Sequence, residues 1–210
     1  MGTKNLILFD FDGTLSDRDS LVDLFIFTHG FIRFCWNMFI SIPVIIVWKL
    51  GLYDAKKGKN FVVNSFYRGW TKSRINEQAE LFLNNRMPKI LRKDAIELVE
   101  SYQNKNNTIV IVSANIDIHL NAFCEKYQLH LICTNLLYEN GIYTGKFASS
   151  NCDKQEKVNR IKAIYNKNDF DKVIAFGNSS GDKAMLNWAN EGYYRYLEQA
   201  NYDSQLGLKM

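Results

Sequence analysis

The chain has 210 residues, of which 47% are hydrophobic and 23% are charged. These proportions are those of folded globular chains, so disorder over most of the length is excluded. The length fits one large domain, or one domain with a small companion. The net charge of +4 suits an anionic ligand or a membrane surface, but it is too weak to indicate a nucleic-acid partner. The densest basic cluster, Lys56, Lys57 and Lys59, is interpreted as a solvated helix face.

The cysteines and the first residues of the chain indicate a cytoplasmic protein. Cys35, Cys124, Cys133 and Cys152 form no C-x-x-C pair and match no zinc-site spacing, so we expect reduced thiols. The apolar run at residues 6–9 is too short for the hydrophobic region of a signal peptide.

Three short apolar runs predict buried strands of a parallel sheet. They are residues 6–9, 109–112 and 173–176, and each leads into small and polar residues. Short apolar runs rich in β-branched residues are typical of strands buried on both faces. Because ligands of open α/β sheets bind beyond the carboxyl ends of the strands, we expect one site at that edge.

Helical periodicity fills most of the remaining chain. A helix is predicted from Pro88 to Tyr102, and residues 136–147, with Asn140-Gly141 at their centre, predict a hairpin. Residues 17–87 show helical periodicity without a convincing buried strand. We interpret 17–87 as a helical cap over the carboxyl edge of the sheet, and 1–16 with 88–210 as a discontinuous core domain.

The oddest part of this cap is residues 34–48, which hold fifteen residues without a charge. A buried cap helix is the favoured interpretation, and a helix lying in a membrane interface is the first alternative. A membrane span is the least favoured, because a span needs about 17–25 apolar residues. Pro43 lies within the run and is expected to kink or break the helix into two segments.

Two carboxylates follow the first predicted strand, in the order Asp10-x-Asp12-Gly13-Thr14. If the chain is still extended there, both side chains point to the same side. An enzyme can use one ionised carboxylate as a nucleophile and a protonated partner as an acid. A bound Mg²⁺ would neutralise such a pair. The alternative is a surface turn, in which Asp-Gly is common.

The chain resembles the haloacid dehalogenase superfamily over nearly its whole length. Residues 10–15 are similar to the first motif of that family, and Ser113 after the second strand matches the second motif. Lys157 matches the third motif, and residues 177–182 match the fourth. Cys152, five residues before Lys157, fits the subgroup that includes phosphoserine phosphatase. The resemblance implies an α/β fold with a Rossmann-like parallel sheet and a helical C1-type cap inserted after the first strand.

The resemblance also implies catalytic roles. Asp10 would attack phosphorus to form an aspartyl-phosphate, and Asp12 would act first as general acid and then as general base. Ser113 and Lys157 would bind the remaining phosphoryl oxygens, and Lys154 is the alternative to Lys157.

The implied metal is Mg²⁺, held by Asp10, the main-chain carbonyl of Asp12, and Asn178 with Asp182. The fourth motif usually begins Gly-Asp, whereas this chain has Gly177-Asn178. An amide oxygen can still bind Mg²⁺, but one negative charge is lost. Whether Asn178 or Asp182 is the direct ligand stays open at this point.

Substrate recognition is expected in the cap. Asp19 lies nine residues after Asp10, where phosphoserine phosphatases carry an acidic residue that meets the substrate amine. A chance Asp in an acidic turn is the alternative. Gly13 and Ala114 complete the expected substrate-binding residues, and Arg68 and Arg74 are candidate cap cations.

The expected function is therefore a Mg²⁺-dependent phosphatase acting on a phosphomonoester. The substrate is a phosphoserine-like metabolite or a phospholipid head group such as phosphatidylglycerophosphate. The alternatives are a phosphate- or membrane-surface-binding module and a phosphotransferase. We expect no nucleic-acid partner and a peripheral membrane contact through 34–48 as one option. His29, His119 and His130 are interpreted as ordinary surface or core residues.

Overall fold

The computed structural model describes residues 4–50, 55–103 and 106–196. A five-stranded sheet lies at its centre, with strand order β3-β2-β1-β6-β7 and every neighbouring pair parallel. The expected α/β fold with a parallel sheet is thus confirmed. The strands are β1 (Asn5–Phe9), β2 (Thr108–Ile116), β3 (His130–Thr134), β6 (Lys172–Gly177) and β7 (Glu191–Tyr194).

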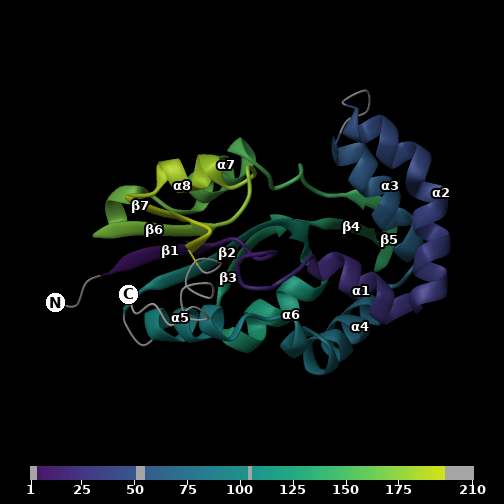
Figure 1. Ribbon diagram of the computed structural model, residues 1–210, viewed down its shortest axis with the longest axis horizontal. Coiled ribbons are helices and arrows are strands. Elements are labelled where there is room, and N and C mark those ends of the chain that lie inside the picture. The colour runs from purple at the N-terminus through teal and green to yellow at the C-terminus, as the bar shows by residue number, and fades with distance from the viewer. Residues whose placement is uncertain (1–3, 51–54, 104–105, 197–210) are drawn as a thin grey trace, which may run out of the picture.

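Helices cover both faces of this sheet (Figure 1). One face carries α7 (Gln155–Ile164) and α8 (Lys183–Trp188), and the other carries α5 (Lys93–Gln103) and α6 (Asp117–Tyr127). Successive residues of β1 point to opposite faces. Leu6 and Leu8 therefore pack in one cluster with Val158 of α7, and Ile7 and Phe9 belong to another.

The predicted helix start at Pro88 is wrong. Pro88 lies in a short 3₁₀ helix, η1 (Met87–Lys89), and α5 begins only at Lys93. The segment between η1 and α5 is hydrogen-bonded to the loop that follows β1. Asp17 N donates to Ile90 O, and Arg92 N donates to Leu15 O. A second 3₁₀ helix, η2 (Lys167–Asp169), precedes β6.

Four helices lie beyond the carboxyl edge of the sheet (Figure 1). They are α1 (Ser20–His29), α2 (Phe31–Lys49), α3 (Ala55–Tyr67) and α4 (Lys72–Asn85). The helical character expected for this part of the chain is thus observed. The division into a core of 1–16 with 88–210 and a cap of 17–87 stays a prediction.

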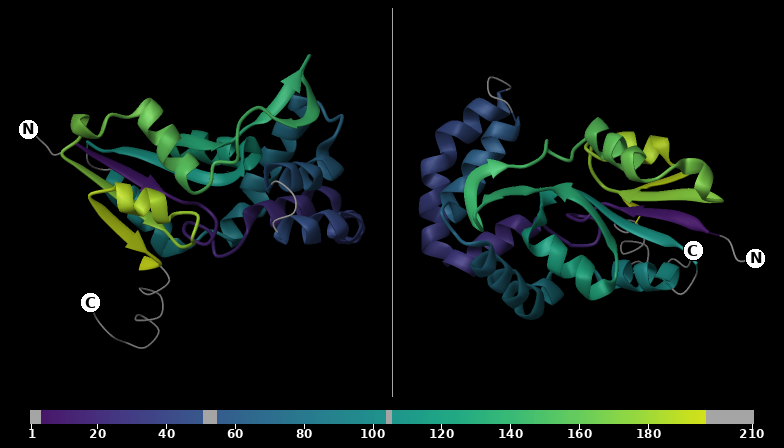
Figure 2. Two further views of the ribbon diagram at one scale, coloured as in Figure 1. Left: turned by 90° about the horizontal axis from the view of Figure 1, so that it is seen from above. Right: turned by 180° about the vertical axis from the view of Figure 1, so that it is seen from behind.

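The predicted hairpin is confirmed as β4 (Leu136–Glu139) and β5 (Ile142–Phe147). Asn140 and Gly141 at its turn have φ of 49° and 75°, the left-handed values that a tight hairpin turn requires. The hairpin projects from the sheet toward the helices (Figure 2). It is attached there by hydrogen bonds from Lys72 N to Gly141 O and from Tyr143 N to Trp70 O.

The expected break of α2 at Pro43 is not observed. The helix runs unbroken from Phe31 to Lys49, although Pro43 lies inside it. Pro43 is on the exposed side, so water can satisfy the Phe39 carbonyl that loses its helical donor. The expectation of a buried helix is met on one side only, because most of the apolar side chains of α2 face solvent. Within the described ranges, no helix combines the length and apolarity needed to cross a membrane.

Candidate functional site

A buried lysine joins the loops that follow the central strands. The Nζ atom of Lys157, from α7, donates to Asp10 Oδ1 and to Asp182 Oδ1, each at 2.6 Å, and to Val112 O at 2.7 Å. Lys157 and Asp182 are almost fully buried and Asp10 is nearly so. Lys157, and not Lys154, thus contacts the first-strand carboxylate.

The two carboxylates that accept hydrogen bonds from Lys157 have pKa values shifted in opposite directions. Burial raises the pKa of Asp10 to about 6, although the charge of Lys157 opposes this. Burial acts on Asp182 too, but the charge and hydrogen bond of Lys157 and the donors from Ser179 outweigh it, so its pKa lies below the usual value. The pKa of Lys157 is raised, because its two carboxylate partners outweigh its own burial. The site therefore favours a charged lysine between carboxylates.

Asp182 uses both carboxylate oxygens inside the protein. While Oδ1 accepts from Lys157, Oδ2 accepts from Asn178 N at 3.1 Å, Ser179 N at 2.9 Å and Ser179 Oγ at 2.8 Å. A Cβ added to Gly177 would lie 2.5 Å from the Asp182 Cβ, so only glycine fits there. Asp182 thus shapes the loop after β6.

Asn178 presents an oxygen that has no partner. Its Oδ1 is buried and accepts no hydrogen bond from any residue that the structure describes. The amide lies against Gly13, which has φ of 78°, and a Cβ at Gly13 would come within 1.9 Å of Asn178 Nδ2. A buried oxygen that has no protein partner, beside the loop after β1, is expected where the partner is a bound cation.

The residues present therefore fit Mg²⁺. The described chain contains no group of three or more His, Cys, Asp and Glu side chains suited to a metal. The expected set instead combines a carboxylate (Asp10), an amide oxygen (Asn178) and the Asp12 main-chain carbonyl. All three are oxygen donors of the kind that Mg²⁺ binds.

Asp12 is held by donors from two other elements. Its Oδ1 accepts from Ser20 N at 2.8 Å and Ser20 Oγ at 2.6 Å, and its Oδ2 accepts from Asn115 Nδ2 at 2.7 Å. Burial, followed by the charge of Asp19, nevertheless raises the pKa of Asp12. Ser20 and Asn115 were not predicted from the sequence to belong to the site.

A histidine lies behind Ser20. The Ser20 hydroxyl gives its hydrogen to Asp12, so the His119 Nε2 at 2.7 Å must be the donor in their contact. His119 is fully buried, and this burial lowers its pKa to about 3. His119 therefore stays neutral and braces Ser20, where the sequence indicated only an ordinary histidine.

A bulge at the end of β2 carries Ser113 and Ala114. The pairing of β2 with β3 shifts between Val112 and Ile116, which frees these residues from the regular ladder. Ser113 is buried, and its Oγ accepts from Asn115 N at 3.0 Å. Since a hydroxyl also carries one hydrogen, Ser113 can still donate to a ligand.

A cavity of about 360 Å³ opens next to Asp12 and Asp19. The helices supply most of its lining, and the bulge supplies Ala114 and Asn115. Its apolar side chains are Leu21, Val22, Phe25, Met38, Ile45, Val62 and Val63. The cavity is thus lined by apolar side chains from the helices and by polar side chains next to Asp12.

Lys59 is the cation of this cavity, which corrects its interpretation as part of a solvated cluster. From α3 it reaches across to the main-chain oxygen of Ala114. Burial lowers the pKa of Lys59, while Asp12 and Asp19 act in the opposite direction. The sequence signal was its spacing, because Lys59 lies on one helical face with Val63 and Phe66.

Asp19 has a structural role beside the cavity. It is the N-cap of α1, and its Oδ1 accepts from Leu21 N at 2.9 Å and Val22 N at 3.2 Å. It also lines the cavity, so its contact with substrate stays a prediction. Arg68 and Arg74 are not among the cavity's described lining residues, and Arg74 stacks on Trp70 at 3.7 Å.

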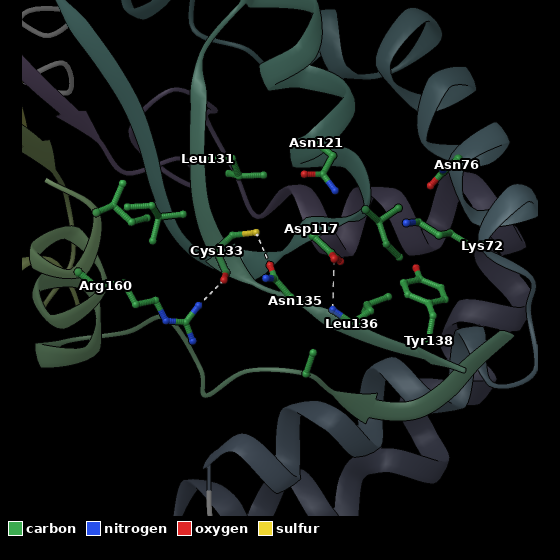
Figure 3. A pocket seen from close by; sticks show the side chains of 15 residues that line it. Lys72, Asn76, Asp117, Asn121, Leu131, Cys133, Asn135, Leu136, Tyr138 and Arg160 are labelled. Atoms are coloured by element: carbon green, nitrogen blue, oxygen red, sulfur yellow. Dashed lines mark hydrogen bonds between the residues drawn. The ribbon is translucent and has the colours of Figure 1, made fainter. Parts of the chain in front are cut away.

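A larger cavity, of about 580 Å³, lies elsewhere, between α6, β3, the hairpin and α7 (Figure 3). Asp117 and Arg160 line it, but none of the proposed catalytic residues does. Size therefore does not identify the reactive site, and the smaller cavity next to Asp12 is the better candidate.

Comparison with known proteins identifies the family to which this chain is similar. The family model of haloacid dehalogenase-like hydrolases matches residues 7–187. Protein CicA from Caulobacter vibrioides is 30% identical over 194 residues, which cover 90% of this chain and 85% of that protein. A phosphoserine phosphatase from Lactococcus lactis is 32% identical over 105 residues, or 49% of each chain.

Solved structures share the fold. A protein of unknown function from Bordetella pertussis Tohama I superposes with a TM-score of 0.78 at 19% identity, covering 95% of this chain and 96% of that one. A phosphoserine phosphatase in the form of a phospho-aspartyl intermediate analogue superposes with a TM-score of 0.62 at 19% identity, covering 91% and 85%.

Proposed function

The chain belongs to the haloacid dehalogenase-like hydrolases, and from this premise we propose that it is a phosphatase of that family. We propose that it hydrolyses a phosphomonoester with the help of Mg²⁺, through an aspartyl-phosphate on Asp10. The observation that carries the proposal is the buried Lys157 that joins Asp10 to Asp182 at 2.6 Å each.

Asp10 is the proposed nucleophile. Lys157 donates to its Oδ1, while the partner of Oδ2 among the described residues is the Thr14 hydroxyl at 3.5 Å, too far for a strong hydrogen bond. Oδ2 would attack phosphorus, and the bond from phosphorus to the substrate oxygen would break. A water would then attack the aspartyl-phosphate, releasing inorganic phosphate and restoring the Asp10 carboxylate.

Asp12 is the proposed proton carrier. It would give a proton to the leaving oxygen and later take one from the attacking water. The donors from Ser20 and Asn115 favour the ionised carboxylate, which is the form left after the first transfer. His119 would keep Ser20 in position without changing charge.

Positive charge is needed around the phosphoryl group. Lys157 and the Ser113 hydroxyl would bind its oxygens, as phosphoryl transfer depends mainly on positioning and charge stabilisation. Mg²⁺, when bound by Asp10, Asn178 and the Asp12 carbonyl, would supply further positive charge against these oxygens. Asn178 is the better candidate ligand than Asp182, whose two oxygens already accept hydrogen bonds.

The apolar wall of the 360 Å³ cavity bears on the substrate. The related Lactococcus protein is a phosphoserine phosphatase, which supports a small phosphomonoester. The lining from α1, α2 and α3 favours an alcohol with an apolar part, and Lys59 adds a cation to the same lining. The apolar lining therefore supports a phospholipid phosphomonoester, which has an apolar part, over phosphoserine.

A substitution of the nucleophile tests the reaction. Asp10→Asn should lower the rate of hydrolysis of an aryl phosphate by about 10³-fold or more while the fold is kept. The assay is run with and without Mg²⁺, and an added alcohol acceptor reveals any phosphotransfer. Asp17→Asn, at an exposed carboxylate paired with Arg18, is the matched control. Retention of a tenth of the wild-type turnover in Asp10→Asn would remove Asp10 from this role.

A further inference from the structure

The outer side of α2 carries a continuous apolar stripe. Its members recur at intervals of four and three residues, which places them on one helical face. Ile32 is 87% exposed, Phe39 is 66% exposed and Trp36 is 63% exposed. The stripe consists of Ile32, Trp36, Phe39, Pro43 and Ile46 of α2, with Leu50 directly after the helix, all exposed.

The opposite face of α2 packs against the rest of the protein. Phe34, Met38, Ser41 and Ile45 are among the partly or fully buried residues of that face. Asn37 adds a hydrogen bond from its Nδ2 to Ser65 O of α3 at 3.2 Å. A surface helix of a globular protein normally has polar residues on its outer face. The apolar stripe therefore does not serve the fold of the described chain, and a large exposed apolar patch marks an interaction site.

The charge of the residues on and around α2 indicates the kind of partner that the stripe would bind. No acidic residue occurs in α2, and Arg33 is exposed beside the stripe. Residues 31–57, which leave out the cavity residue Lys59, contain four basic residues and one acidic residue, a net charge of +3 against a formal net charge of +4 for the whole chain. A helix that is apolar on its outer face and flanked by basic residues is complementary to anionic lipid head groups.

We propose that the outer stripe of α2 lies in the interface of an anionic lipid membrane. The helix would lie parallel to the surface, with Trp36 and Phe39 below the head groups and Arg33 among them. In Figures 1 and 2, α2 forms the outer edge of the molecule, so no other described element shields it.

This placement connects the membrane with the candidate site. Met38 and Ile45, on the inner face of α2, line the 360 Å³ cavity beside Asp12. A helix with its side chains is about 10 Å across, so the cavity would lie within about one helix diameter of the lipid. The membrane contact itself does not depend on the proposed reaction.

Flotation with lipid vesicles tests the proposal on the full chain. Vesicles of phosphatidylglycerol and phosphatidylcholine should carry the wild type upward at low salt, and vesicles of phosphatidylcholine alone should carry much less. The double substitution Ile32→Glu with Phe39→Glu should reduce the bound fraction by about tenfold or more. Leu81→Glu, at a residue of α4 that is 43% exposed, is the matched control and should float like the wild type.

Two further measurements separate the outcomes. Hydrolysis of a soluble aryl phosphate by the double variant should equal that of the wild type, which shows that the variant is folded. Asp10→Asn should float normally, so loss of the reaction and loss of binding are distinguishable. Bromine-labelled lipids should quench the wild-type fluorescence, and Trp36→Phe should reduce this quenching.

The proposal is overturned if the wild type stays at the bottom of the gradient at low salt with anionic vesicles. It is also overturned if the double variant floats as well as Leu81→Glu. A wild-type dimer in solution that Ile32→Glu with Phe39→Glu dissociates, without any flotation, would assign the stripe to a second copy of the chain instead.

Discussion

Asn178 and Asp182 lie on one loop but have different surroundings. Asp182 accepts four hydrogen bonds, whereas Asn178 Oδ1 accepts none from the described residues. The sequence alone left the choice of metal ligand between them open. In the folded loop, Gly177 leaves room for the Asp182 side chain, which holds the loop together. Asn178 is therefore the residue that stays available to a cation.

We predict that Asn178→Asp tightens the binding of Mg²⁺ by about tenfold, because a carboxylate adds charge to a hard-cation site. Calorimetric titration of the substrate-free protein with Mg²⁺ measures this directly. Asn159→Asp adds the same charge at an exposed position of α7 and should leave the affinity unchanged. An unchanged or weaker affinity in Asn178→Asp would show that position 178 does not contact the metal.

Asp117 should make the stability of the protein depend on pH. Its Oδ2 accepts from Leu136 N at 3.2 Å (Figure 3), but its Oδ1 is buried without a partner among the described residues. Burial raises its pKa from 3.8 to about 6. Because the folded pKa is above the unfolded one, ionisation of Asp117 costs stability as the pH rises from about 4 to 6, and the cost is constant above that.

Asp117→Asn removes this charge and keeps an oxygen for Leu136 N. The variant should match the wild type near pH 4 and exceed its free energy of unfolding by about 3 kcal/mol at pH 8. Denaturant unfolding at a series of pH values measures the difference. Asp169→Asn, at an exposed carboxylate, should show no such trend. A gain of equal size at pH 4 and pH 8 would contradict the assigned cause.

The site residues divide by what the sequence can reveal. Motif order alone selected Asp10, Asp12, Ser113 and Lys157 as candidates, and the structure brings Lys157 into contact with Asp10. Ser20, Asn115 and His119 reach Asp12 only through tertiary contacts between α1, β2 and α6. Nothing in their local sequence distinguishes them from ordinary polar residues.

At the scale of elements, buried strands were predictable and edge strands were not. The central strands β1, β2 and β6 are apolar runs, as burial on both faces requires. The edge strands β3 and β7 begin with His130 and Glu191 and contain exposed residues, so they lack that pattern. The environment of α2 was not predictable, because a helix that is apolar all round has the same sequence whether protein, water or lipid covers it.

The position of Lys59 on α3 gives a prediction about binding. Lys59 contacts the Ala114 carbonyl at the cavity and no atom proposed to react, so it should act on the bound substrate and the transition state alike. Lys59→Met should raise KM by about tenfold with a smaller change in kcat, since hydrogen bonds to charged groups contribute about 1.5–3 kcal/mol.

Steady-state kinetics with an aryl phosphate measure both constants. Lys57→Met changes an exposed lysine of the same helix and should leave them unaltered. An unchanged KM in Lys59→Met would show that Lys59 supports the position of the Ala114 bulge and does not bind substrate.

At the scale of the whole molecule, the helical layer and the sheet share one hydrophobic cluster. The cluster contains Ile7 and Phe9 of the sheet together with Phe25, Phe66 and Phe82 of the helices. Phe82 is fully buried, and its ring meets those of Phe27 and His119 edge to face. A cluster without a break should transmit a loss of packing in the helices to the sheet.

We therefore predict that the chain unfolds in one cooperative transition. Trp70 reports on the helical layer and Trp188 on the sheet, so variants that retain only one of these tryptophans can be compared in denaturant. Their transitions should coincide with each other and with the loss of helical circular dichroism. Phe82→Ala should lower the free energy of unfolding by about 3–5 kcal/mol and shift both transitions equally. If the Trp70 transition moved alone and the Trp188 transition stayed in place, the helices and the sheet would be separate folding units, and the shared cluster would not couple them.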